Sequence, residues 1–128
     1  MKDVLISAKS LKKEFYTGET SQTIFENLTL DIYKGDFTII MGASGAGKST
    51  LMYSLSGMDR PTSGSIVFSD KEITEYNDDE LAVFRRKNCG FVFQQIYLLE
   101  KMSLMDNVLT AGALCNDNKK DVIKRAKE

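Results

Sequence analysis

A glycine-rich stretch in the first half of the chain has the residue types and spacing of a phosphate-binding loop. Gly42, Gly47, Lys48 and Ser49 fit the pattern G-x-x-x-x-G-K-[ST], and Thr50 follows. The glycines let the backbone curl tightly, so that successive N–H groups can face a polyphosphate. Lys48 supplies a mobile cation for the β- and γ-phosphates, and the Ser49 hydroxyl can ligate Mg²⁺. The loop therefore predicts binding of a nucleoside triphosphate together with magnesium.

The segments on either side of this loop have the patterns that it requires. Residues 37–41 form a nearly continuous apolar run, which is typical of a strand buried on both faces. Residues 48–56 predict a helix with Leu51, Leu55 and Met58 on one face. A strand before and a helix after the loop make the motif specific. The residues predicted to bind the nucleotide are Gly42, Ala43, Ser44, Gly45, Ala46, Gly47, Lys48, Ser49 and Thr50.

The strand patterns predict an α/β fold that begins with an antiparallel β portion. Residues 28–32 alternate between apolar and polar side chains, as half-buried strands do. Residues 4–8 alternate weakly, and residues 65–68 predict another strand. Residues 89–93 predict a further strand, which we expect to join residues 37–41 in one mostly parallel sheet. The helix over 48–56 should pack on that sheet through Leu51 and Leu55.

Three more helices follow from capping signals. Asn77 and Glu80 predict a capping box, with basic residues 85–87 at the other end of that helix. Ser103 and Asp106 predict the start of a helix that runs to Leu114. A last helix begins at residue 119, and its apolar face would need a partner. Gly57 is placed to end the helix that follows the loop.

Composition excludes several classes of protein. The 128 residues carry 17 basic and 18 acidic side chains, and this balance argues against a nucleic-acid partner. The apolar runs are too short for a bilayer span or a signal peptide. The chain has no histidine, which removes Ser-His-Asp and Cys-His catalysis. Cys89 and Cys115 are isolated and are predicted to be buried, reduced side chains.

The second half of the chain carries a family resemblance. The segment GFVFQQ at residues 90–95, followed by MSLMDNV at 102–108, resembles the Q-loop region of ATP-binding-cassette (ABC) transporter ATPases. DRPTSGSI at 59–66 is similar to the family's segment after the P-loop helix. DEL at 79–81 and FRRK at 84–87 resemble the branch that exports macrolides, lipoproteins and antimicrobial peptides. The resemblance extends over essentially the whole chain.

The resemblance implies roles for single residues. Lys48, in the Walker A loop, and Gln94, as the Q-loop glutamine, would be catalytic, and Ser49 and Gln94 would contact Mg²⁺. An aromatic side chain near the start would stack on the adenine of ATP. Phe15 fits the spacing to Gly18 better, and Tyr16 is the alternative. Ordinary strand packing of both aromatic side chains is also open.

Some features of the family are absent from this sequence. The family has an LSGGQ signature, an acidic Walker B strand end and a switch histidine. Residues 55–57 imitate the signature inside the P-loop helix, and residues 96–100 imitate Walker B directly after the Q-loop. We expect residues 1–128 to form the N-terminal part of one ABC-type ATP-binding domain, truncated before the signature. Alone, it would be inactive in ATP hydrolysis. The alternatives are a nucleotide-binding module without turnover and a small P-loop kinase.

The resemblance also implies partners and a location. It implies an ATP-binding subunit that couples ATP binding and hydrolysis to export across a membrane. Its partners would be a transmembrane permease subunit or domain and a second ATP-binding subunit, as a homodimer in the complete protein. It would be cytoplasmic, held on the inner face of the membrane through its permease. A cluster of apolar residues after the Q-loop is either local core or an exposed docking patch: Ile96, Tyr97, Leu98, Leu99, Met102, Leu104 and Met105.

Overall fold

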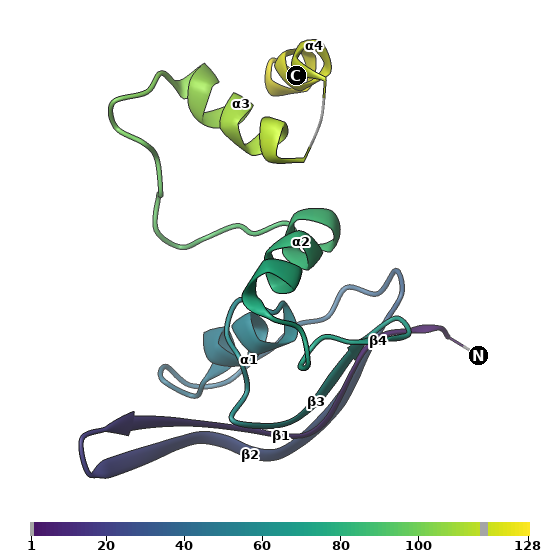
Figure 1. Ribbon diagram of the computed structural model, residues 1–128, viewed down its shortest axis with the longest axis vertical. Coiled ribbons are helices and arrows are strands. Elements are labelled where there is room, and N and C mark those ends of the chain that lie inside the picture. The colour runs from purple at the N-terminus through teal and green to yellow at the C-terminus, as the bar shows by residue number, and fades with distance from the viewer. Residues whose placement is uncertain (1, 116–117) are drawn as a thin grey trace. The chain divides into compact units, whose positions relative to one another are not determined.

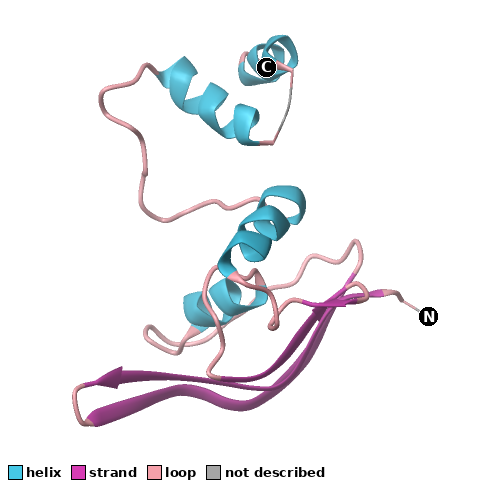
Figure 2. Ribbon diagram, in the orientation of Figure 1, coloured by secondary structure: helices cyan, strands magenta, loops and turns pink. Residues whose placement is uncertain are grey.

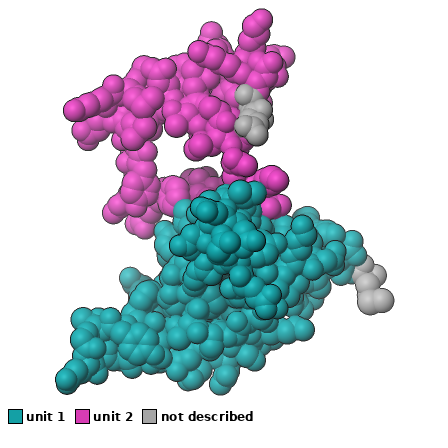
Figure 3. All heavy atoms as spheres, in the orientation of Figure 1, with its two compact units in different colours: residues 1–85 teal, residues 86–128 magenta. Residues whose placement is uncertain are grey.

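The structure, a computed structural model, describes residues 2–115 and 118–128. The chain forms two compact units, residues 1–85 and 86–128 (Figure 3). The first unit contains the strands and helix α1, and α2 runs across the division at residue 85 (Figures 1 and 2). The elements of the chain are β1 (Val4–Thr17), β2 (Thr20–Tyr33), α1 (Lys48–Leu55), β3 (Ser63–Phe68), β4 (Lys71–Glu72), α2 (Asp78–Asn88), α3 (Leu104–Leu114) and α4 (Lys119–Ala126).

The first unit is built on an antiparallel sheet of order β2-β1-β3-β4. Strands β1 and β2 form a long hairpin, paired from Val4 with Tyr33 to Thr17 with Thr20. The antiparallel N-terminal portion is thus confirmed, although its strands are longer than the predicted 4–8 and 28–32. Register irregularities interrupt the pairing at several points between Val4 and Glu14, and the pairing then continues to Thr17 and Thr20.

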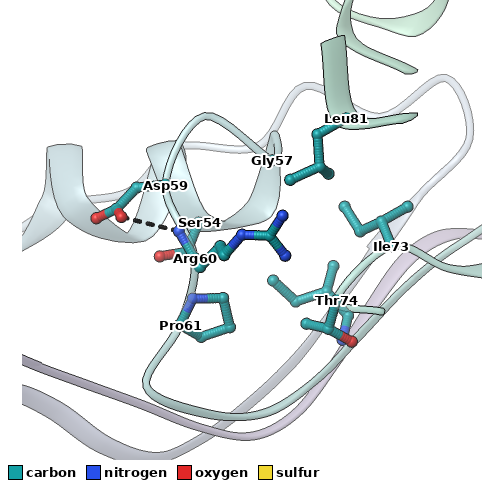
Figure 4. A pocket seen from close by; sticks show the side chains of 9 residues that line it. Ser54, Gly57, Asp59, Arg60, Pro61, Ile73, Thr74 and Leu81 are labelled. Atoms are coloured by element: carbon teal, nitrogen blue, oxygen red, sulfur yellow. Dashed lines mark hydrogen bonds between the residues drawn. The ribbon is translucent and has the colours of Figure 1, made fainter. Parts of the chain in front are cut away.

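Apolar residues of β1, β3, α1 and α2 supply the core of the first unit. α1 contributes Leu51 and Leu55, which are buried at 7% and 4% exposure, although the parallel sheet predicted to receive them does not form in the described residues. Met58, expected on the same face, lies past the end of the helix and is 39% exposed. Figure 4 shows Leu81 and Ile73 around a narrow pocket beside the end of α1. The remaining buried apolar residues of this unit are Ala8, Leu11, Ile66 and Phe84.

The helix ends form as the local signals predict. Gly57 has φ 68° after α1, and the N–H groups of Gly57 and Met58 donate to the carbonyls of Ser54 and Tyr53, at 3.2 and 2.9 Å. This is a Schellman motif, which satisfies carbonyl groups at the helix end. At the start of α2, the Asn77 N–H donates to Glu80 Oε2 (2.8 Å) and the Glu80 N–H to Asn77 Oδ1 (3.0 Å). These reciprocal bonds confirm the predicted capping box.

The prediction of strands over 37–41 and 89–93 is wrong. Both segments run without regular structure, and the side chains of Phe37 and Val92 are 92% and 98% exposed. A strand that is buried on both faces needs hydrogen-bonded neighbours at both edges and a covering layer. Across the described ranges, neither segment pairs with another strand. Their apolar sequence therefore produces no sheet here.

The second unit contains a helix pair. Val122 of α4 is 6% exposed and packs where α3 has a glycine, because a Cβ on Gly112 would lie 2.7 Å from Val122 Cγ1. α3 itself has no buried residue. The prediction that both cysteines are buried is also wrong: Cys115 is exposed after α3, and Cys89 is half-buried. Neither is in a disulfide. In the two described ranges, no helix combines the length and apolarity needed to cross a bilayer.

Candidate functional site

The glycine-rich loop is irregular up to Gly47 and becomes helical at Lys48. The Ala46 N–H donates to the Ala43 carbonyl over 3.2 Å, which closes a turn. Gly47 is the N-cap of α1, and its carbonyl accepts from the Leu51 N–H at 2.8 Å. No side chain caps this helix start. The first N–H groups of the helix therefore lack a side-chain acceptor, and an anion can supply one.

Gly47 is at a position where only glycine fits. Its φ is 81°, a left-handed conformation that side chains with a Cβ rarely adopt. A Cβ there would also collide with the side chain of Ile24 on β2 and lie 3.8 Å from Phe25 Cδ1. The second glycine of the motif thus brings the start of α1 against β2.

Lys48 lies across the loop that precedes it. Its Nζ donates to the carbonyl oxygens of Gly42 and Ala43, at 3.0 and 2.6 Å. These two acceptors hold the ammonium group over the loop, within reach of the turn at residues 43–46. Phosphate oxygens bound in the loop would replace neutral carbonyls with charged acceptors, which form stronger hydrogen bonds with an ammonium.

Ser49 is exposed beside Lys48 in the first turn of α1. No group of three or more carboxylate, thiol or imidazole side chains that could hold a metal ion occurs in residues 2–115 and 118–128. A magnesium ion at this loop would therefore need phosphate oxygens and water besides Ser49. Mg²⁺ commonly takes that coordination, because it retains waters and binds with few protein ligands.

Phe15 and Tyr16 lie on opposite faces of β1, as neighbours in a strand do. The Phe15 ring is 45% exposed, and Lys13 Nζ lies 4.9 Å from its centroid. Tyr16 is 69% exposed, and its hydroxyl donates to Glu14 Oε2 over 3.0 Å. Lys13 pairs directly with Phe25 of β2, the residue near Gly47. Phe15 therefore shares the face of the hairpin that contacts the phosphate-binding loop.

Glu14 anchors a polar cluster on the Tyr16 face. Hydrogen bonds from Ser21, Tyr16 and Lys12 hold the pKa of the Glu14 carboxyl below its usual value. The bond to Glu14 in turn raises the pKa of the Tyr16 phenol. The hydrogen bond to Glu14 thus holds the Tyr16 ring on the face of β1 opposite to Lys13.

Gln94 lies in the second unit, in the irregular segment between α2 and α3, and its side chain is exposed. Nearby rings contact one another: Phe91 and Phe93 are stacked with centroids 5.7 Å apart, and Phe93 and Tyr97 meet edge to face with centroids 5.2 Å apart. Gln94 and the loop residues belong to different units, whose positions relative to each other are not determined. Its role stays a prediction.

The apolar cluster after Gln94 is exposed in the second unit. The exposed members are Ile96 (85%), Tyr97 (70%), Leu98 (50%), Leu99 (53%), Met102 (40%) and Leu104 (75%), and Met105 is half-buried. Asn107 fixes the adjoining turn, because its side chain accepts from the Leu99 N–H (2.8 Å) and donates to the Ser103 carbonyl (3.0 Å). The sequence left two interpretations open, a local core and an exposed docking patch. Because these side chains are exposed, they do not form a local core within the second unit.

Sequence reasoning missed Lys13. Its side chain is 9% exposed, forms an ion pair with Asp59 Oδ2 at 2.7 Å and donates to the Arg60 carbonyl at 2.6 Å. A signal was available, because a lysine two residues before Phe15 in a strand lies on the same face as that ring. Its burial and its partner depend on the loop after α1, which the strand pattern does not reveal.

The phosphate-binding loop, ending at the start of a helix that packs beside a β-sheet, defines a P-loop nucleotide-binding protein. The family profile described as ABC transporter matches residues 25–128. The chain therefore belongs to the ABC transporter family. This decides against the small P-loop kinase.

Relatives and solved structures agree with this family. The macrolide export ATP-binding/permease protein MacB of Campylobacter fetus is 40% identical over 97% of this chain and 19% of its own length. The lipoprotein-releasing system ATP-binding protein LolD of Idiomarina loihiensis is 38% identical, over 84% of this chain and 47% of its own length. The dimeric ABC cassette MJ0796 matches with a TM-score of 0.88 and 33% identity, over 95% of this chain and 54% of that one. A post-hydrolysis dimer of MJ0796 bound to ADP and Pi matches with a TM-score of 0.86 and 30% identity, over 94% of this chain and 55% of that one.

The match covers only part of each relative. The chain spans about half the length of the LolD relative and about a fifth of the MacB relative. The shared part contains the phosphate-binding loop and the Gln94 segment.

Proposed function

We propose that this chain binds ATP with Mg²⁺ at residues 42–50, as the nucleotide-binding part of an export ATPase of the MacB and LolD type. The observation that carries the proposal is the uncapped start of α1, with Lys48 Nζ held across the loop by the Gly42 and Ala43 carbonyls. Backbone N–H groups, the helix dipole and one ammonium group then converge on a single anion.

Each loop residue has a distinct part in this proposal. Backbone N–H groups of residues 44–49 cradle the phosphates, and Lys48 neutralises charge on the β- and γ-phosphates. The Ser49 hydroxyl is a ligand of Mg²⁺, which when bound neutralises phosphate charge. Gln94 would approach the ion or the attacking water. Phe15 would stack on adenine, because it shares the face of the hairpin that contacts Gly47, whereas Tyr16 is bonded to Glu14.

The proposed partners are a transmembrane permease and a second ATP-binding subunit. We expect no nucleic-acid partner. The exposed apolar cluster at residues 96–105 supports a contact with the permease, since contiguous exposed apolar side chains mark interaction surfaces. Through such a contact the protein would be held on the cytoplasmic face of the membrane.

Tyr97→Ala and Met102→Asp, introduced separately into a complete ATPase subunit, should abolish membrane association and transport while ATP binding persists. Unchanged association would refute the docking role.

Titration calorimetry with Mg-ATP tests nucleotide binding. Lys48→Ala should weaken affinity by about a hundredfold, because a hydrogen-bonded charge contact in a binding site contributes about 2–3 kcal/mol. Lys71→Ala, on the exposed strand β4, is the matched control and should bind as the unchanged chain does. Equal affinity in the Lys48 and Lys71 variants would refute the proposal.

A further inference from the structure

We propose that Lys13 is a positioning residue for the nucleotide base, because it fixes the Phe15 ring relative to the phosphate-binding helix. The inference rests on the proposed function, since it concerns the aromatic side chain that would stack on adenine. Its starting point is the ammonium of Lys13, which lies 4.9 Å from the centroid of the Phe15 ring. A cation over an aromatic face is attracted to the ring and restricts its orientation.

The Lys13 ammonium is itself held firmly. The Lys13 side chain is 9% exposed, and lysine is rarely buried unless paired. Its partners are Asp59 Oδ2 at 2.7 Å and the Arg60 carbonyl at 2.6 Å. A buried charge with two such partners has a single favoured position.

Those partners are anchored to the end of α1. The N–H groups of Met58 and Asp59 both donate to the Tyr53 carbonyl, at 2.9 and 3.2 Å. The Arg60 N–H donates to the Asp59 carboxylate at 2.8 Å, the dashed contact in Figure 4. The same helix begins at Lys48. A continuous set of contacts therefore joins the helix that would bind the phosphates to the ring that would bind the base.

Thr62 connects this loop to β1 on both sides of Lys13. Its N–H donates to the Lys12 carbonyl at 2.7 Å, and its hydroxyl accepts from the Glu14 N–H at 2.9 Å. The backbone at Lys13 is thus fixed independently of its side chain. Removal of the ammonium should free the ring of Phe15 while the strand stays in place.

Lys12 is the matched control, because it is adjacent but faces a different set of groups. Its Nζ pairs with Glu14 Oε2 at 3.3 Å and Glu26 Oε1 at 3.5 Å, on the Tyr16 side of the hairpin. Lys12→Met removes the same charge from the same strand and leaves the ring contact intact.

The test compares ATP with inorganic tripolyphosphate, which offers the phosphates without the base. In the full chain, Lys13→Met should weaken ATP binding by about tenfold, because the cation–π contact with Phe15 is lost, and change tripolyphosphate binding by less than about twofold. Lys12→Met should change neither affinity. Lys13→Arg keeps a cation that can lie over the ring and pair with Asp59, so it should restore most of the ATP affinity.

A second measurement reports stacking itself. The fluorescence of 2-aminopurine riboside triphosphate falls when the base stacks, so saturating complexes of the Lys13→Met variant should be brighter than those of the unchanged chain. If Lys13→Met proves unable to fold, Asp59→Asn provides the same comparison, because it weakens the anchor and retains the buried lysine. Selective loss of ATP affinity is again the expected result.

Three results would overturn the proposal. Equal losses for ATP and tripolyphosphate would make Lys13 a structural residue only. Unchanged ATP binding in Lys13→Met would remove the link to the base. If the unchanged chain binds neither ligand, the proposed function itself fails, and this outcome is distinct because no variant is needed to see it.

Discussion

Gly47 makes the phosphate-binding loop sensitive to the smallest possible substitution. Its positive φ and its closeness to Ile24 are separate constraints, and Gly18 in the hairpin turn has only the first. Gly18 has φ 63°, and no atom lies within 4 Å of the place that its Cβ would take. A comparison of substitutions at Gly47 and Gly18 therefore separates the effect of backbone strain from the effect of a collision with Ile24.

Gly47→Ala should lower the free energy of unfolding by more than Gly18→Ala and should also reduce ATP affinity. The left-handed conformation costs about 1–2 kcal/mol at either site, and overpacking against Ile24 adds about 1–3 kcal/mol at Gly47. Urea denaturation and nucleotide titration of both variants measure the two effects. Equal destabilisation by Gly47→Ala and Gly18→Ala would contradict this prediction, because it would show that the Ile24 side chain moves to make room for the new Cβ.

The Glu14 cluster predicts a pH dependence of stability. Because the folded pKa is depressed, the ionised carboxylate stabilises the fold above the unfolded value of about 4.3. That contribution is lost as the pH falls through the lower folded pKa. Glu14→Gln should therefore lower the melting temperature slightly near neutral pH and have no effect in strong acid. Glu19→Gln, in the hairpin turn, is the control, and a Glu14→Gln effect that grows on acidification would contradict the assignment.

At the residue scale, spacing predicted the glycine-rich loop before α1 but not the contacts of Lys13 with the segment after α1. Gly47, Lys48 and Ser49 lie within one contiguous motif, so their position at a glycine-rich turn and a helix start could be predicted from the sequence, and their roles toward a nucleotide stay predictions. Lys13 was missed because its partners, Asp59 and Arg60, are far from it in sequence. The choice between Phe15 and Tyr16 likewise depends on which face of the hairpin meets α1.

At the scale of elements, the α3 and α4 pair depends on the glycine at position 112. In an exposed helix, a change from glycine to alanine normally stabilises by about 1 kcal/mol. Here a Cβ would lie 2.7 Å from Val122 Cγ1, and Val122 is the buried residue of α4. For Gly112→Ala, the packing therefore predicts a loss of stability, whereas the helix propensity predicts a gain.

We expect Gly112→Ala to destabilise the α3–α4 pair despite the better helix former. Adding Val122→Ala should reverse the sign, because the smaller side chain makes room for the methyl group. Amide hydrogen exchange in α3 and α4 measures both variants. Stabilisation by Gly112→Ala alone would show that the two helices do not pack at this point.

Elements that depend on neighbours in sequence were predicted well, and those that depend on distant partners were not. The capping box at Asn77 and Glu80 and the glycine stop at Gly57 need only a few adjacent residues. The apolar runs at 37–41 and 89–93 need strands beside them, and none pairs with them in the described part of the chain. An apolar run indicates that a segment tends to be buried, but it does not show which strand or helix would cover it.

At the scale of the whole molecule, the chain spans about half of a cassette such as MJ0796. We expect it to bind ATP without hydrolysing it at the rate of a complete relative. Phosphoryl transfer depends on positioning and charge stabilisation, and the 128 residues include no histidine to serve as the family's switch. Phosphate release, followed with Mg-ATP, should match that of Lys48→Ala. Release at the rate of a full-length relative, lost in Lys48→Ala, would contradict this expectation.

The most direct test of the central claim is a titration of the ¹⁵N-labelled chain with Mg-ATP, followed by the backbone amide resonances. If residues 42–50 bind the phosphates, the largest shifts should fall on amides 44–50, at the uncapped start of α1. Smaller shifts should follow at Phe15, and the Lys48→Ala variant should lose both sets. Shifts confined to other segments, or none at saturating nucleotide, would contradict the assignment of this loop as the nucleotide site.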